Sequence, residues 1–123
     1  MIPPSLREQL GRDSERLACR FLSSRGYRIE ATNVRFRVGE IDIVARDGDT
    51  LCFVEVRATS SSQWGGALGS ITDQKRRRLM RAARWYLARL TDLPPETRFD
   101  VVAVEWENGR PRPELLQDAF QVD

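Results

Sequence analysis

The stretch GEIDIVARDGDTLCFVEVR (residues 39–57) predicts two strands joined by a tight turn. Residues 39–46 and 50–58 are the strand-like runs, and the Asp-Gly-Asp triplet between them is typical of a hairpin turn. Each run carries a carboxylate among apolar residues, where a plain core strand would have none. Asp42 and Glu55 are therefore the first candidates for a functional site.

The length of the turn decides whether these two carboxylates meet, because successive side chains of a strand point to opposite faces. A two-residue loop at 48–49 places Asp42 directly opposite Glu55, and one at 47–48 places them diagonally on one face. A three-residue loop puts them on opposite faces. Two-residue loops are the commonest hairpin connection, so we expect a shared face and a separation of roughly 5–8 Å. Such a pair is suited to a hard divalent cation, and ion pairing with arginine is the alternative.

Composition limits the chemistry that this chain can perform. Its 123 residues predict one domain (1–123), and the net charge is only +2. Lys75 is the one lysine beside nineteen arginines. The absence of histidine excludes histidine general bases, Ser-His-Asp triads and histidine-zinc sites.

Cysteine usage and hydropathy indicate the compartment. Cys19 and Cys52 are isolated in apolar contexts, which is typical of buried thiols in a reducing environment rather than a disulfide framework. No apolar run reaches transmembrane length, and residues 1–5 lack the apolar region of a signal peptide. We therefore expect a cytoplasmic protein with no membrane partner.

Hydrophobic periodicity predicts the order helix, three strands, helix, strand, with a possible additional C-terminal strand. Outside the hairpin, the expected elements are helices at 6–25 and 70–90 and strands at 27–37, 98–106 and 114–122. Ser70 or Thr72 is expected to cap the second helix, and Asn33 to interrupt the first strand. An antiparallel meander followed by a right-handed helical crossover gives a mixed β-sheet flanked by helices, an α/β fold.

Several motifs occur in a specific order along most of the chain, from about residue 10 to residue 104. They are GEID (39–42), FVEVR (53–57), Lys75 and RFDVV (98–102), together with Gly11, Glu15 and Gly26-Tyr27. This set resembles the YraN-like family of uncharacterised bacterial proteins, which is similar to archaeal Holliday junction resolvases and to the restriction-endonuclease-like PD-(D/E)xK nucleases. The resemblance implies a restriction-endonuclease-like αβββαβ core. The family as a whole has no settled biochemical activity.

The resemblance also implies roles for individual residues. Asp42 and Glu55 stand at the two carboxylates of the nuclease motif, Arg57 stands at its lysine, and Glu15 would be an accessory acid from the first helix. Asp42, Glu55 and Glu15 would hold Mg²⁺ or Mn²⁺ for hydrolysis of phosphodiester bonds in structured or damaged DNA.

Arg57 and Lys75 are the cationic candidates for the catalytic site. Arginine supplies charge and hydrogen bonds, but its pKa above ~12 prevents it from acting as a base near neutrality. Arg57 either keeps the charge-stabilising function of the lysine or marks weakened catalysis. Lys75 lies in line with the apolar stripe of the second helix, so it either points toward the carboxylates or extends from the edge of the stripe into solvent.

Basic residues on the second helix form the candidate nucleic-acid-binding surface. The residues concerned are Arg76, Arg77, Arg81 and Arg84. The alternative is a solvated helix face, and Trp64 in the preceding loop is either part of a flap or an ordinary packed side chain. Two rival functions remain: a catalytically inactive nucleic-acid-binding module, and a scaffold whose edge strand pairs with another subunit, which would make a homodimer.

Overall fold

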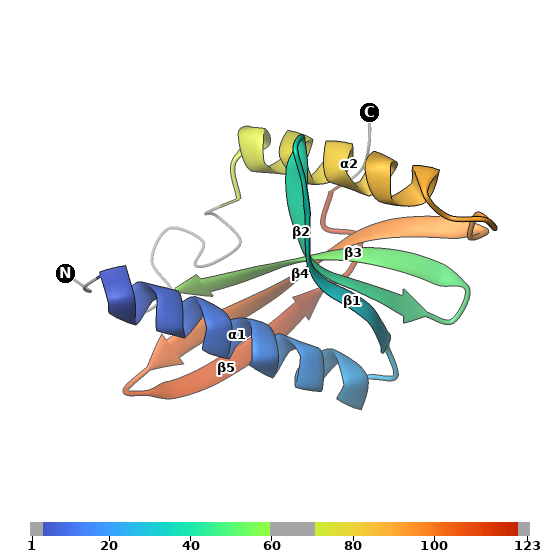
Figure 1. Cartoon of the computed structure of the whole chain (residues 1–123). Helices are drawn as coiled ribbons and strands as arrows, with labels where there is room; N and C mark the ends of the chain where they lie inside the picture. The colour runs from blue at the N-terminus through green and yellow to red at the C-terminus, as the bar shows by residue number, and fades with distance from the viewer. Residues whose placement is uncertain (1–3, 60–70, 121–123) are drawn as a thin grey trace.

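The computed structural model describes residues 4–59 and 71–120. The expectations for Trp64 and Ser70 lie outside these ranges. The chain forms a five-stranded sheet in the order β1-β2-β3-β4-β5, with two helices (Figure 1). Its elements are α1 (Pro4–Ser24), β1 (Arg28–Phe36), β2 (Gly39–Asp47), β3 (Thr50–Thr59), α2 (Asp73–Ala88), β4 (Glu96–Glu107) and β5 (Arg110–Leu116).

The sheet has the mixed topology expected from the sequence. Strands β1, β2 and β3 form an antiparallel meander, and α2 connects β3 to its parallel neighbour β4. Strand β5 then pairs antiparallel with β4. This order, αβββαββ, confirms the predicted α/β fold together with its additional C-terminal strand.

The two helices cover opposite faces of the sheet, and each face has its own apolar core (Figure 1). The core under α1 is built from Ala18, Leu22, Ile43, Cys52, Val54 and Val102 among others. The core under α2 is built from Val44, Phe53, Leu79, Ala82, Ala83 and Phe99 among others. Neighbouring residues of β2 and β3 alternate between the two cores, as the two-residue period of a strand requires.

Local signals at the helix ends agree with the prediction. The Thr72 hydroxyl accepts a hydrogen bond from the backbone N–H of Lys75 at 3.2 Å, so Thr72 is the N-cap of α2. Gly26 follows α1 with φ of 90°, a left-handed conformation that favours glycine after a helix.

Gly39 starts β2 where the strand passes directly over the backbone of α2. A Cβ atom at this position would lie 2.2 Å from the carbonyl oxygen of Arg78. Only glycine fits this contact, which explains why the GEID motif begins with glycine. The close approach fixes the start of β2, and with it Asp42 three residues later, relative to α2.

Two details of the fold differ from the prediction. The last strand is Arg110–Leu116 rather than 114–122, and Pro111 and Pro113 are inside it. Proline is tolerated there because β5 is an edge strand and needs partners on one side only. The two-residue period of a strand would put Ile41 and Ile43 on one face, but Ile41 packs in the α2 core and Ile43 in the α1 core, so β2 changes orientation between them.

Candidate functional site

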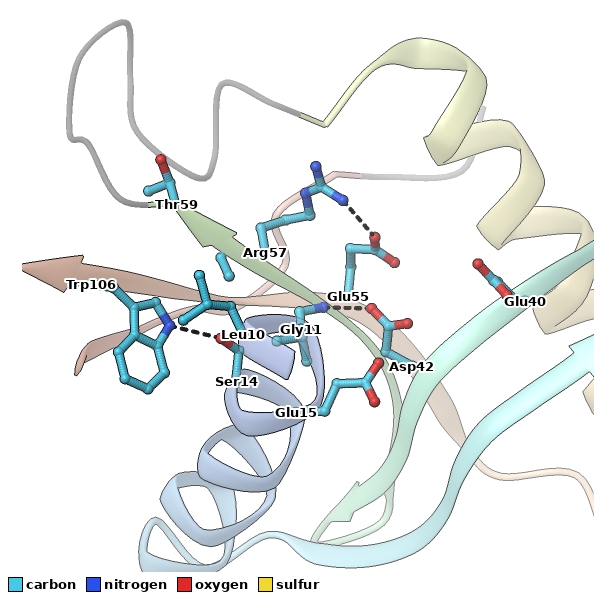
Figure 2. Close-up of a pocket in the computed structure, with 12 residues that line it drawn as sticks. Leu10, Gly11, Ser14, Glu15, Glu40, Asp42, Glu55, Arg57, Thr59 and Trp106 are labelled. Carbon is cyan, nitrogen blue, oxygen red and sulfur yellow. Dashed lines mark hydrogen bonds and ion pairs between the residues drawn. The ribbon is translucent and has the colours of Figure 1, made fainter. Parts of the chain in front are cut away.

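The hairpin between β2 and β3 has the two-residue loop that brings the carboxylates together. Asp47 pairs with Thr50, which leaves Gly48 and Asp49 as the loop, and Gly48 has φ of 61°. The same register continues to the pair Ile43–Val54. Asp42 is therefore placed opposite Glu55 on one face, as predicted, and both side chains point into one pocket (Figure 2).

Strand regularity breaks down on both sides of Asp42. Toward β3, its Oδ2 accepts a hydrogen bond from the backbone N–H of Val56 at 2.9 Å, so the side chain takes the place of a backbone acceptor. Toward β1, the neighbouring residue is Asn33, which has φ of 51°. The predicted interruption near Asn33 is wrong in position: β1 pairs with β2 in one register on both sides of Asn33, and its register shift lies between Ile29 and Ala31. Such local departures from regular geometry are common at functional sites.

A pocket of about 600 Å³ surrounds the two carboxylates. Its walls come from the N-terminal half of α1 and from β2, β3 and β4 (Figure 2). Besides Asp42 and Glu55, it is lined by Leu10, Gly11, Ser14, Glu15, Glu40, Val56, Arg57, Ala58, Thr59 and Trp106. The structure thus brings together four of the predicted site residues: Asp42, Glu55, Glu15 and Arg57.

The electrostatic environment favours protonation of the carboxylate pair. Burial is the main cause that raises the pKa of Asp42 to about 6, and the negative charges of Glu15 and Glu40 raise it further. Burial, followed by the charge of Asp42, raises the pKa of Glu55 to about 8. The proton is held more strongly by Glu55, because the neighbouring charge of Asp42 favours its neutral form. Near neutrality the pair therefore holds one shared proton.

Both cationic candidates act on Glu55. The Arg57 Nη1 atom is 3.8 Å from Glu55 Oε1, and both side chains are largely buried (Figure 2). Lys75 lies in the first turn of α2 with an exposed side chain, and its charge lowers the pKa of Glu55. Lys75 was expected either to point toward the carboxylates or to extend into solvent. Its exposure matches the second alternative, yet its charge still acts on Glu55.

The donor set fits a hard cation that keeps part of its water shell. Within residues 4–59 and 71–120, no three acidic or cysteine side chains are gathered closely enough to enclose an ion. Glu15 shares the pocket and acts on Asp42 through its charge, but it does not complete such a group. Two carboxylate oxygen donors suit Mg²⁺, which retains several waters and takes other ligands from phosphate.

Trp106 forms part of the pocket, which no pattern in the sequence indicated. Its indole Nε1 donates a hydrogen bond to the hydroxyl of Ser14 at 2.8 Å, and Ser14 is buried. This contact ties the end of β4 to α1 across the pocket wall (Figure 2). It joins residues that are 92 positions apart, so no local sequence pattern could predict this contact.

The predicted basic surface of α2 divides into two parts. Arg77, Arg81 and Arg84 are exposed. Arg76 is half-buried, with its guanidinium 5.5 Å from the Phe120 ring centre and 3.9 Å from Asp73. Of the four predicted residues, these first three are therefore the ones accessible from solvent.

Arg98 and Asp100 form an ion pair within β4, outside the residues that line the candidate pocket. Arg98 Nε lies 2.8 Å from Asp100 Oδ1, and Nη2 lies 3.0 Å from Oδ2. The Tyr27 hydroxyl and the backbone N–H of Asp118 also donate to Asp100, each at 2.9 Å.

Comparisons with known proteins identify relatives of this chain. The profile of the uncharacterised protein family UPF0102 matches residues 14–104, which confirms the predicted YraN-like relationship. A UPF0102 protein of Symbiobacterium thermophilum is 50% identical over 91% of this chain and 96% of its own length. One from Desulfosudis oleivorans is 44% identical over 95% of this chain and 94% of its own. Among the described residues, no helix has the length and apolar character needed to cross a membrane.

Proposed function

The chain belongs to the uncharacterised protein family UPF0102, and from that premise we propose that it binds nucleic acid and acts as a metal-dependent endonuclease on structured or damaged DNA. The observation that carries this proposal is the buried Asp42–Glu55 pair, which shares one pocket with Arg57. Negative charge on both carboxylates at once is unfavourable, and a bound cation would relieve this repulsion as protonation does. The resemblance of GEID and FVEVR to PD-(D/E)xK nucleases gives further support, and the cytoplasm is the matching location.

Each residue of the site has a role in this proposal. Asp42 and Glu55 would hold Mg²⁺ or Mn²⁺, which when bound supplies Lewis-acid polarisation of a phosphoryl oxygen. Arg57 offers fixed positive charge and hydrogen bonds to the phosphate, as a transition-state stabiliser rather than a base. Lys75 adds positive charge at the rim, and the exposed arginines of α2 hold the flanking duplex through its phosphates.

Arg57 also favours a second candidate function, a nucleic-acid-binding module without catalysis. Its guanidinium already lies beside Glu55, and it cannot accept a proton near neutral pH. A site of this kind would keep the charge complementarity to phosphate while lacking the chemical step.

A cleavage panel separates these functions. We would incubate the protein with linear, nicked, flapped, single-stranded and four-way DNA in Mg²⁺ and in Mn²⁺. Endonuclease function predicts cleavage of at least one substrate, which is abolished by Asp42→Asn and by Glu55→Gln. Arg57→Lys should keep or raise the rate, and Arg57→Ala should lower it by ~10²–10³-fold, as when one transition-state donor is lost.

Two results would change the conclusion. DNA binding without cleavage in the wild type and in every Arg57 variant would favour the binding module. Cleavage that survives Asp42→Asn would remove the carboxylate pair from the mechanism altogether.

A further inference from the structure

A second groove meets the candidate site at its carboxylates. Its volume is about 400 Å³, and it runs between α1 and the strands β1 and β2. Glu15 and Asp42 line both this groove and the first pocket, so the two hollows join at these two acids, next to Glu55. An extended polymer bound along the groove would reach the carboxylates without any change in the protein fold.

Three arginines of α1 line this groove in a regular row. Arg12, Arg16 and Arg20 are spaced four residues apart, and all three are exposed. Four residues of α-helix span about 6 Å, and residues at this spacing follow one side of the helix. Arg16 also lies 3.7 Å from Asp13, but an exposed pair of this kind contributes little and yields easily to another anion.

The rest of the groove has the mixed character of a sugar-phosphate site. Thr32 and Asn33 offer hydrogen-bonding groups from β1, while Ile43 and Cys19 offer apolar contact. Positive charge therefore borders one wall, and polar and apolar groups form the remainder. Arginines that only keep a helix face solvated would not be expected to border a groove that leads to a carboxylate pair. The groove therefore favours a binding role for this row.

We propose that Arg12, Arg16 and Arg20 bind successive phosphates of a single nucleic-acid strand and lead that strand to the Asp42–Glu55 pair. This inference rests on the proposed function, because the strand is the substrate of that same site. It assigns strand engagement to α1 and leaves the arginines of α2, on the opposite face of the sheet, for flanking duplex.

The experiment compares two matched triple variants of the full chain. Arg12→Gln/Arg16→Gln/Arg20→Gln removes the α1 row, and Arg77→Gln/Arg81→Gln/Arg84→Gln removes three exposed arginines from α2. Both keep good helix formers at exposed positions. Binding of a fluorescent single-stranded oligonucleotide is measured by anisotropy over a salt series, and thermal unfolding reports whether each variant is folded.

The α1 variant should bind the single strand at least ~10-fold more weakly than wild type. Its salt slope should fall by about 2, because each lost single-strand phosphate contact removes about 0.7. The α2 variant should keep the wild-type slope on the same oligonucleotide. Arg12→Lys/Arg16→Lys/Arg20→Lys, which keeps the charge, should restore most of the affinity.

The outcomes distinguish this inference from the proposed function. If the wild type binds DNA and the folded α1 variant binds the single strand with unchanged affinity and slope, the α1 row is not the strand site and the proposed function stands. Equal losses in both triple variants would also overturn the assignment to α1. If the wild type binds no nucleic acid, the proposed function fails and this inference falls with it.

Discussion

Two buried carboxylate sites on the same sheet differ in how many hydrogen bonds they receive. Asp100 on β4 has no exposed surface, and it receives hydrogen bonds from Arg98, Tyr27 and the backbone of Asp118. Asp42 receives one backbone hydrogen bond and otherwise faces Glu55 and other acids. A buried charge that is fully paired belongs to the fold. A carboxylate whose neighbours are other acids instead requires a proton or a bound cation to offset their repulsion.

The sharpest way to test this difference is the same substitution at both sites. Asp100→Asn should lower the free energy of unfolding by about 3 kcal/mol, because it leaves Arg98 partly buried without its main counter-charge. Asp42→Asn should leave the free energy of unfolding unchanged or raise it, because it removes repulsion. Urea unfolding in the absence of divalent cations measures both. A loss of more than ~2 kcal/mol in Asp42→Asn would make Asp42 a structural residue like Asp100.

The pH dependence of stability gives a second test. The pKa values of Asp42 and Glu55 are raised to about 6 and about 8 in the folded protein, so above pH ~4 the unfolded chain binds fewer protons than the folded one. The free energy of unfolding should therefore fall by several kcal/mol as pH rises from about 4 to about 8, because the folded pair must give up protons that the unfolded chain has already lost.

Glu55→Gln provides the control for this pH effect. The difference in unfolding free energy between wild type and this variant should grow in favour of the variant as pH rises from 5 to 8.5. A difference that stays constant with pH would show that the carboxylates ionise normally.

The smallest expected effects concern neighbours of the two sites. Tyr27→Phe removes a hydroxyl that donates to Asp100 and accepts from Arg98 and Gln117, and it should cost about 1 kcal/mol of stability. Glu15→Gln removes only a repulsive charge beside Asp42, so it should change stability by less than ~0.5 kcal/mol. Chemical denaturation of the two variants side by side checks the contrast. Equal losses of unfolding free energy in the two variants would contradict the proposed difference between the Asp100 and Asp42 sites.

Much of this arrangement could be predicted from local sequence signals. The hairpin loop at Gly48-Asp49 fixes the register, and the register places Asp42 opposite Glu55. The cap at Thr72 and the stop at Gly26 are likewise local, and each depends on one residue type at one position. The pairing of the two carboxylates depends on the strand register, and it could therefore be predicted from the sequence.

The remaining features depend on contacts between distant segments. Strand β5 was predicted to begin after Pro111 and Pro113, whereas both prolines lie inside it at an edge position that tolerates them. The turn of β2 between Ile41 and Ile43 follows from the packing of Gly39 on α2, which no period along the strand reveals. The Trp106–Ser14 contact and the groove beside α1 exist only once the helix lies across the sheet.

Metal binding to the Asp42–Glu55 pair is the most direct test of the central claim. Mn²⁺ binding to wild type, Asp42→Asn and Glu55→Gln would be followed by water proton relaxation at pH 6 and at pH 8.5. We expect weak binding to wild type that is tighter at pH 8.5, because the shared proton must leave before the cation enters. We expect it to disappear in both variants. Binding that is the same in all three proteins, or independent of pH, would contradict the claim that this pair is a cation site.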